Sequence, residues 1–481
     1  MFNKKSLIAT LITLMVAQPM AMAANVPLPD IGTAAVATLS VGQEIEMGDY
    51  YLRMLRADAP LSYDPLINQY LNQLGHKLVE KADSVQTPFN FFVMRSRVVN
   101  AFAFFGGNVV IHSQLVLLTD NESQLASVMS HEISHVTQRH LARMMESQKN
   151  NSPYIWGAAL GSILLALANP QAGMAAFTST LAGSQQSAIS FTQGNEQEAD
   201  RIGMNILTKA GFDPYAFADF LEKLSDDSRF STKPPEMLLT HPLPTNRLAD
   251  IRNRANQLKR PTVTSSLDYY LAKIRLAVFS KNQNTTQLIL NNYRQSHQPV
   301  TQIALDYGQA LVAYHQHHYA QAEKILTPLL SSYPNNVWFI DLMTDLDLKT
   351  NHTAKAITRL QQALKNNPNS QVLQLNLANA YLENNDLSQA ATLLHRYTHQ
   401  NSNDINGWEL LGTTYSKQRL RGEEMMARAE ISALQGQFQQ AIRLLTNAKS
   451  YLQNNKTLSA RSNARITQLE QLQKRYAQYK H

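Results

Sequence analysis

Two histidines four residues apart, in the segment His131-Glu-Ile-Ser-His135, constrain the fold of this chain more than any other feature. On an α-helix, residues i and i+4 share one face, so both imidazoles reach a single metal ion only if the segment is helical. Glu132 then stands beside the metal, where its carboxylate can accept a proton from an attacking water. The pattern therefore predicts a metal-dependent hydrolytic site built on a helix.

The residues around this segment favour one long helix over about Asp120 to Glu146. Thr119-Asp-Asn-Glu122 has the form of a capping box, which is a frequent helix start. An apolar stripe follows at helical spacing, made of Leu125, Val128, Met129, Ile133 and Val136. The alternative is a long surface helix that carries its histidines incidentally, and a second motif argues against it.

The segment Glu196-Gln-Glu-Ala-Asp200 supplies what the first motif lacks. A catalytic zinc site needs a third protein ligand and an open fourth position. Glu196 and Asp200 are again four residues apart, so Glu196 can be the third ligand while Asp200 accepts the second N–H of a ligand histidine. An ordinary charged helix face is the alternative interpretation, and Glu198, between the two, has no predicted role.

Together, the two motifs resemble the gluzincin metallopeptidases of the HtpX and CAAX prenyl protease family, in which HExxH is followed by ExxxD. The segment from Asn100 to His112 is similar to the strand that precedes the family's metal helix. Thr240-His241-Pro242, with Asn246-Arg247 after it, is similar to a family segment downstream of the third ligand. The resemblance covers about Gly42 to Asp250.

This resemblance implies a zinc endopeptidase that binds one Zn²⁺ per chain. It makes His131, His135 and Glu196 the zinc ligands. Glu132 is expected to be the general base and then the proton donor to the leaving amine. Asp200 is expected to hold a ligand histidine in the correct tautomer.

His241 lies in a stiff loop, between the Pro234-Pro235 pair and the prolines Pro242 and Pro244, and three roles are open to it. It can bond the oxyanion of the tetrahedral intermediate, which would make it catalytic. It can instead occupy the fourth zinc position, which would keep the enzyme latent until the loop moves. It can also simply face solvent. Arg247 is the natural partner of a nearby carboxylate or oxyanion.

The stretch from Asn100 to Ile111 is rich in β-forming residues around a Gly-Gly pair. An edge strand here would hold an extended substrate by adding it as one more strand. A plain core hairpin is the equal alternative. The three phenylalanines Phe102, Phe104 and Phe105 are expected in the core.

The first residues, Met1 to Ala23, have the form of a signal peptide. Lys4 and Lys5 make the basic start, an apolar run follows, and cleavage is expected after Ala23. The mature chain is therefore expected in the periplasm. It contains no cysteine, so disulfides contribute nothing to its stability.

No charged residue occurs between Asn150 and Asn195, and Tyr154 to Leu167 is apolar. A transmembrane helix needs about 20 apolar residues, and this run is shorter. A lid or membrane-surface contact near the active site is the favoured interpretation. A buried pair of core helices and a true membrane span are the alternatives.

The second half of the chain carries a repeat. A small residue is followed twelve positions later by alanine in Gly308/Ala320, Thr344/Ala356, Ala378/Ala390 and Ala429/Ala441. The alanines are 36, 34 and 51 residues apart, and tetratricopeptide repeats are 34 residues long. The longest gap predicts an additional helix, and Ser265 to Pro299 reads as a further degenerate helical pair.

The expected fold class is mainly α (α+β). A gluzincin metallopeptidase domain with a small β-sheet precedes an all-α tetratricopeptide-repeat solenoid. The expected division is a signal peptide over 1–23, the zinc metallopeptidase domain over 24–260 and the repeat domain over 261–481.

Tetratricopeptide arrays form concave surfaces that bind proteins, so unfolded protein substrates are expected partners. The resemblance, extended by the export signal and the repeats, implies outer-membrane β-barrel proteins stalled in assembly as clients. It also implies the barrel-insertion machinery as a partner, and a chaperone-like activity beside cleavage. The formal charge of +7 comes without a basic block interleaved with aromatics, so nucleic-acid binding is not expected. The basic balance supports at most a weak peripheral membrane contact.

Two other function classes stay open. One is a chaperone or adaptor whose zinc site is structural or permanently capped by His241. The other is a membrane-anchored quality-control protease, held by Tyr154 to Leu167.

Overall fold

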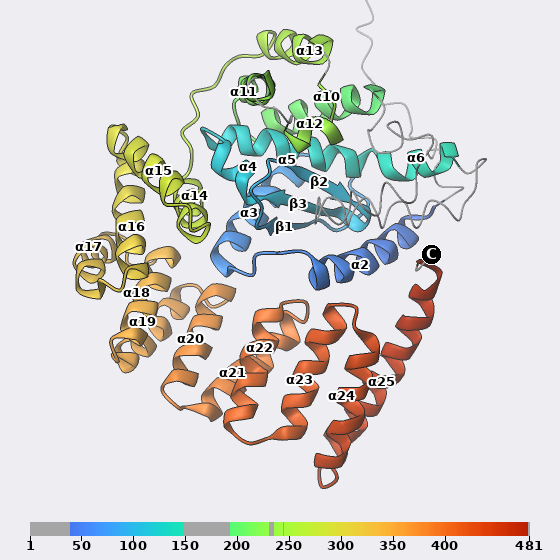
Figure 1. Ribbon diagram of the computed structural model, residues 1–481, viewed down its shortest axis with the longest axis vertical. Helices are drawn as coiled ribbons and strands as arrows, with labels where there is room; N and C mark the ends of the chain where they lie inside the picture. The colour runs from blue at the N-terminus through green and yellow to red at the C-terminus, as the bar shows by residue number, and fades with distance from the viewer. Residues whose placement is uncertain (1–38, 149–192, 230–234, 244, 480–481) are drawn as a thin grey trace, which may run out of the picture.

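A computed structural model describes residues 39–148, 193–229, 235–243 and 245–479 of this 481-residue chain (Figure 1). A small sheet lies at the centre of the first half, with the strands β1 (Asn90–Met94), β2 (Ala101–Phe104) and β3 (Asn108–His112). Helices pack around it: α2 (Val41–Asp58), α3 (Pro65–Val79), α4 (Ser113–Leu118), α5 (Glu122–Thr137), α6 (His140–Gln148), α10 (Gln193–Lys209), α11 (Tyr215–Arg229), α12 (Glu236–Thr240) and α13 (Thr245–Asn256).

The sheet has the order β1-β3-β2, with β1 parallel and β2 antiparallel to β3. A tight turn through Gly106 and Gly107, both with positive φ, joins β2 to β3. In the described sheet β2 is an edge strand, whereas β3 is central and buried at every position. The stretch is thus a hairpin with one edge strand and one buried central strand, and addition of a substrate strand there stays a prediction. The phenylalanines at 102, 104 and 105 are buried in the core, as expected.

The prediction of one long helix over 120–146 is wrong, because α5 ends at Thr137 and α6 begins at His140. Arg139 adopts a left-handed conformation between them, with φ 53°. Its Nε donates to Glu44 Oε1 over 2.7 Å and its Nη2 donates to the carbonyl of Leu39. A buried ion pair from a distant helix thus stabilises a break that local helix propensity does not predict.

The start of α5 also differs from the predicted capping box. Asn121 is the cap, and its Oδ1 accepts from the backbone N–H of Gln124 over 3.0 Å. The Gln124 side chain returns to the backbone N–H of Asp120 over 2.7 Å. Glu122 instead accepts from the backbone N–H and the hydroxyl of Ser266, because the second half of the chain packs there.

The second half consists of antiparallel helices: α14 (Leu267–Phe279), α15 (Gln283–Gln295), α16 (Pro299–His315), α17 (Tyr319–Ser332), α18 (Val337–Lys349), α19 (Thr353–Asn366), α20 (Gln371–Glu383), α21 (Leu387–Gln400), α22 (Ile405–Lys417), α23 (Arg421–Leu434), α24 (Phe438–Tyr451) and α25 (Lys456–Tyr476). A left-handed residue in the turn between paired helices recurs every 34 residues, at His317, Asn351, Asn385 and Arg419. The expected fold class is therefore confirmed. The 51-residue gap from Ala390 on α21 to Ala441 on α24 holds two helices, α22 and α23, where the shorter gaps hold one. The division at residue 260 stays a prediction.

The array curves around the lower side of the first half, and both of its ends return to it (Figure 1). At one end, Arg275 on α14 bonds Asp64 at the start of α3 over 2.8 Å, and Asp341 on α18 over 3.0 Å. At the other end, the hydroxyl of Tyr476 on α25 donates to Asp49 on α2. The repeats are thus held against the first half at two separated places.

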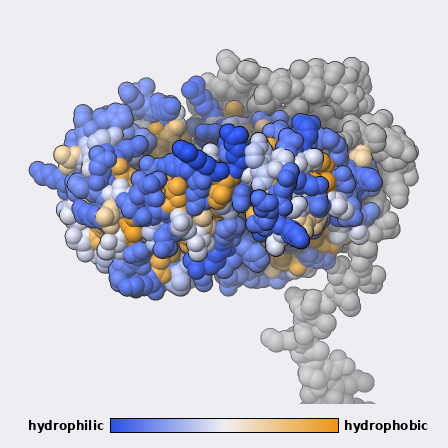
Figure 2. All heavy atoms as spheres, turned by 90° about the horizontal axis from the view of Figure 1, so that it is seen from below, coloured by the Kyte–Doolittle hydropathy of each residue, from blue (hydrophilic) through white to orange (hydrophobic). Residues whose placement is uncertain are grey.

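Figure 2 views the molecule from below, onto the side that carries the repeats, where hydrophilic residues dominate and apolar ones are scattered. In the part of the chain that the structure describes, no helix has both the length and the apolar character needed to cross a membrane. The segments Met1 to Ala23 and Tyr154 to Leu167 lie outside the described residues, so the expectations for them stay predictions.

Gly48 offers a test of how α2 is seated on the β2–β3 turn. A Cβ at this position would overlap the carbonyl oxygen of Phe105, so we expect Gly48→Ala to destabilise the protein by about 1–3 kcal/mol. Gly42→Ala is the matched control in the same helix, because its Cβ would meet nothing closer than 4.0 Å and should stabilise by about 0.5 kcal/mol. Thermal unfolding followed by circular dichroism measures both; equal midpoints for the two variants would contradict this packing.

Candidate active site

The HEISH motif lies on α5, whose residues from Glu122 to His135 are all buried. α10 packs along it at Gly203, where an added Cβ would stand 3.1 Å from the backbone nitrogen of His131. A larger residue at that position would push the two helices apart. Gly203 therefore lets the acids of α10 reach the histidines of α5, a role that the sequence alone did not assign.

Four side chains converge on one point. His131, His135, Glu196 and His241 each offer one ligand atom, and these atoms all lie within 4.8 Å of one another. The Nε2 atoms of His131 and His135 are 3.0 Å apart, and each lies 3.4 Å from an oxygen of Glu196. Neighbouring ligands of a tetrahedral zinc ion, at about 2.0–2.1 Å from it, are separated by roughly 3.4 Å. The donor set and its spacing therefore fit a zinc ion.

Glu132 lies at the same place but outside this ligand set. Its side chain is buried, and its Oε1 has no hydrogen-bond partner among the described residues. Nε2 of His241 lies 3.5 Å from this oxygen. A buried carboxylate oxygen without a donor is costly unless something else binds there, which suits a group that faces a reacting water.

His241 follows α12 directly and is buried, so its solvent-facing alternative is wrong. Its Nδ1 lies 3.1 Å from Glu196 Oε1 and 3.4 Å from His131 Nε2, while its Nε2 faces Glu132. Its backbone nitrogen donates to the carbonyl of Met237 over 2.8 Å. The ring thus contributes the fourth possible ligand atom of the cluster.

Asp200 and Arg247 stand behind the ligands. Asp200 Oδ1 lies 3.0 Å from Nδ1 of His131, the ring nitrogen that faces away from the cluster. Arg247 donates to both oxygens of Asp200, and its Nη1 lies 2.7 Å from Glu196 Oε2. Arg247 is therefore the partner of two carboxylates, and it also donates to the carbonyl of Pro242 over 2.9 Å.

These contacts keep the acids ionised. Burial would raise the pKa of Glu196, but His241 and His131 outweigh it and hold this pKa well below its usual range. Burial acts the same way on Asp200, and there Arg247 and His131 lower the pKa. Burial would lower the pKa of His131, yet Asp200 and Glu196 raise it to about 9. Burial, reinforced by the charge on His131, holds the pKa of His135 well below its usual value. The cluster thus offers the ionised carboxylate of Glu196 to a cation, and Asp200 remains ionised beside His131.

Two residues without a predicted role adjoin the cluster. His140 is buried, and its Nδ1 lies 2.8 Å from Nδ1 of His135. Glu198 Oε2 lies 3.1 Å from the other ring nitrogen of His140 and accepts from Arg143 over 2.9 Å. Helical spacing does not predict the contact between His135 and His140, because residues five apart do not share a face. His140 reaches His135 only because the chain breaks at Arg139.

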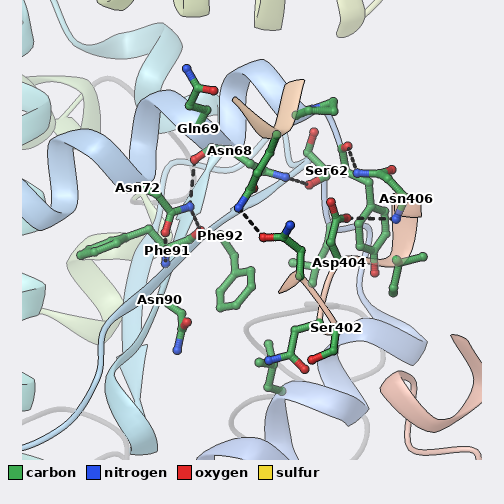
Figure 3. A pocket seen from close by; sticks show the side chains of 18 of the residues that line it. Ser62, Asn68, Gln69, Asn72, Asn90, Phe91, Phe92, Ser402, Asp404 and Asn406 are labelled. Atoms are coloured by element: carbon green, nitrogen blue, oxygen red, sulfur yellow. Dashed lines mark hydrogen bonds between the residues drawn. The ribbon is translucent and has the colours of Figure 1, made fainter. Parts of the chain in front are cut away.

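A large cavity lies elsewhere, between the first half of the chain and the repeats (Figure 3). It has a volume of about 900 Å³ and is lined mainly by polar side chains, many of them carboxamides, from α3, β1 and the loops after α19 and α21. Asn72 in its wall bonds both the N–H and the carbonyl of Phe91, which closes that part of the β1 edge. None of the four converging ligands lines this cavity.

Comparison with known proteins agrees with this geometry. Residues 65–255 match peptidase family M48, and residues 347–413 match a tetratricopeptide repeat. The chain is 55% identical to the β-barrel assembly-enhancing protease of Escherichia coli O157:H7, over 99% of this chain and 98% of that protein. It is 44% identical to a putative β-barrel assembly-enhancing protease of Vibrio cholerae, over 96% of each.

A more distant relative matches less than half of this chain. The metalloprotease LoiP of Escherichia coli is 30% identical over 41% of this chain and 73% of its own length. The two segment matches and the full-length similarities therefore show that the chain belongs to the β-barrel assembly-enhancing proteases of metallopeptidase family M48.

Proposed function

We propose that this metallopeptidase is a periplasmic, zinc-dependent endopeptidase that acts in the assembly and quality control of outer-membrane β-barrel proteins. The observation that carries the enzymatic part is the buried convergence of His131, His135, Glu196 and His241 beside the carboxylate of Glu132. Bound zinc supplies a Lewis acid that polarises the scissile carbonyl. His131, His135 and Glu196 would hold it.

Each remaining residue has a task in this proposal. Glu132 accepts the proton of the attacking water and returns it to the leaving amine, in keeping with its buried, unbonded Oε1. Asp200 holds the ring of His131 from behind, since 3.0 Å separates the two groups. Arg247 neutralises Asp200 and Glu196 together and so keeps the third ligand in place.

We propose further that His241 is a latch. Its Nδ1 lies among the ligands and its Nε2 faces Glu132, so the seated ring blocks both the open position and the general base. A role toward the oxyanion would need the ring to lie beside the reacting carbonyl without covering Glu132. Movement of the Thr240–Pro242 segment would then start the reaction by uncovering both groups.

Client binding is assigned to the repeats. Carboxamide side chains both donate and accept hydrogen bonds, so the cavity between the repeats and the first half suits a polypeptide backbone. We also propose outer-membrane β-barrel proteins as clients and the barrel-insertion machinery as a partner; the names of the full-length relatives, which state a role in β-barrel assembly, support this proposal. Export with cleavage after Ala23 and a peripheral membrane contact belong to the same proposal.

A chaperone or adaptor with a permanently capped metal site is the second candidate, and the buried seat of His241 is the observation that favours it. The two candidates differ in what Glu132 does. The Glu132→Gln variant separates them, because it removes the general base and leaves the repeats intact. It is tested in cells that depend on this protein for β-barrel assembly.

The latch makes a direct prediction. If the seated ring keeps about 90% of the molecules closed, His241→Ala raises casein cleavage by about tenfold while zinc content stays near one per chain. Glu132→Gln is the blank, and the double variant Glu132→Gln/His241→Ala must be as inactive as that blank. Lower activity in His241→Ala with zinc retained would instead make His241 catalytic.

Metal removal tests the ligand set independently of cleavage. Stripping the metal with 1,10-phenanthroline should abolish casein cleavage and lower the thermal midpoint, because the ion binds only the folded site. Zinc at 100 times its dissociation constant should restore about 2.7 kcal/mol of stability. Glu196→Gln is the control and should show a smaller zinc-dependent shift, because it loses the one carboxylate ligand and keeps the histidines. A shift as large as that of the wild type would remove Glu196 from the ligand set.

Loss of the general base tests the second candidate. We expect Glu132→Gln to lose casein cleavage and the degradation of misassembled β-barrel clients in cells, while the amounts of purified protein and bound zinc stay unchanged. Immunoblots of client levels report the result. Full cellular function of Glu132→Gln would favour the chaperone or adaptor over the peptidase.

A further inference from the structure

The two histidines of HEISH are supported from behind in different ways. Nδ1 of His131 lies 3.0 Å from a carboxylate, Asp200. Nδ1 of His135 lies 2.8 Å from another imidazole nitrogen, Nδ1 of His140. His140 is fully buried, and its Nε2 lies 3.1 Å from Glu198 Oε2.

The positions of the protons in this second chain follow from elementary chemistry. Two nitrogens 2.8 Å apart need one hydrogen between them. His135 must keep the lone pair of Nε2 for a metal ion, so its single hydrogen is on Nδ1. His140 therefore accepts at Nδ1 and carries its own hydrogen on Nε2. That N–H points to the carboxylate of Glu198, which can only accept.

We propose that His140 and Glu198 are positioning residues for the metal site, acting through His135. They fix the tautomer and the ring orientation of His135 and increase the basicity of its Nε2 as a ligand. This inference rests on the proposed function, since it requires His135 to be a metal ligand. It assigns a role to Glu198, which lies between Glu196 and Asp200 on α10.

The break after α5 makes the contact possible. At 100° per residue, a continuous helix would place residue 140 about 140° around the axis from residue 135. The left-handed turn at Arg139, anchored on Glu44, starts a new helix at His140 and brings its ring back over His135. The helix break thus serves the metal site and not only the packing.

The arrangement also balances charge on both sides of the metal helix. α10 supplies an acid to each histidine of HEISH, to His131 directly and to His135 through His140, and each acid has an arginine. Asp200 has Arg247, and Glu198 has Arg143 at 2.9 Å. Glu198 lies two residues from Glu196 and points away from the cluster on the helix, so His140 is the intermediate that connects it to His135.

A purely structural role, in which His140 and Glu198 only hold α6 against α10, is the competing explanation. Metal affinity separates the two explanations. Mutation of a residue that hydrogen-bonds to a metal-binding histidine typically lowers metal affinity by about 10- to 100-fold. The experiment strips the full-length protein of metal and titrates it with Zn²⁺ against a chelating dye. The absorption spectrum of the Co²⁺-loaded protein then reports the ligand geometry.

We expect His140→Ala and Glu198→Ala to weaken Zn²⁺ binding by about 10- to 100-fold and to change the Co²⁺ spectrum. Glu198→Gln keeps an acceptor for the His140 N–H but loses the charge, so its affinity should lie between those of the wild type and Glu198→Ala. His112→Ala is the matched control, since His112 is also buried and bonds the carbonyl of Val98 over 3.2 Å. It should lose stability and keep its Zn²⁺ affinity within about twofold.

Unchanged Zn²⁺ affinity in both His140→Ala and Glu198→Ala would overturn the inference. If His140→Ala fails to fold, the pair Glu198→Ala and Glu198→Gln decides, because Glu198 is partly exposed. His131→Ala separates this result from the proposed function. If His131→Ala loses Zn²⁺ binding while His140→Ala and Glu198→Ala keep it, only the positioning role is overturned. Equal binding by the wild type and His131→Ala overturns both.

Discussion

Arg247 is the contact on which the metal site depends. Glu196 and Asp200 are both buried against the metal helix, and burial of an unpaired carboxylate costs several kcal/mol. Arg247 reaches both acids from α13, so α10 can bring them to the histidines only when α13 is docked. The same guanidinium holds the carbonyl of Pro242, which ties the His241 loop to this network. Glu196, Asp200 and the loop that carries His241 therefore share one counter-charge.

A second buried arginine joins the two halves of the chain in the same way. Arg275 bonds Asp64, which caps α3, and Asp341 on α18. At the far end of the array, Arg53 on α2 donates to the carbonyl of Ala433 on α23 over 2.6 Å. Since the array is attached at both ends, the carboxamide-lined cavity between the halves has walls from both (Figure 3). A polypeptide bound there would contact the two halves together.

Most of the candidate site is predictable because its spacing is local. Residues four apart on a helix must share a face, so the spacing within HEISH and between Glu196 and Asp200 is enough to predict which side chains lie together. The helix break and His140 are not predictable in this way. The break at Arg139 depends on Glu44, 95 residues away, and no local pattern shows that contact. Glu198 has no predicted role for the same reason, since its partner lies on another helix.

What the sequence by itself determined is the set of periodic features: two pairs of site residues at helical spacing, the β-rich stretch before them and a 34-residue repeat. Periodicity follows from backbone geometry, which each segment carries alone. Only the tertiary structure decided how these segments meet. It buried His241, 110 residues from His131, beside the ligands, and it brought His140 to His135. Such contacts are selected by packing and by the pairing of buried charges across the whole molecule, so no single segment encodes them.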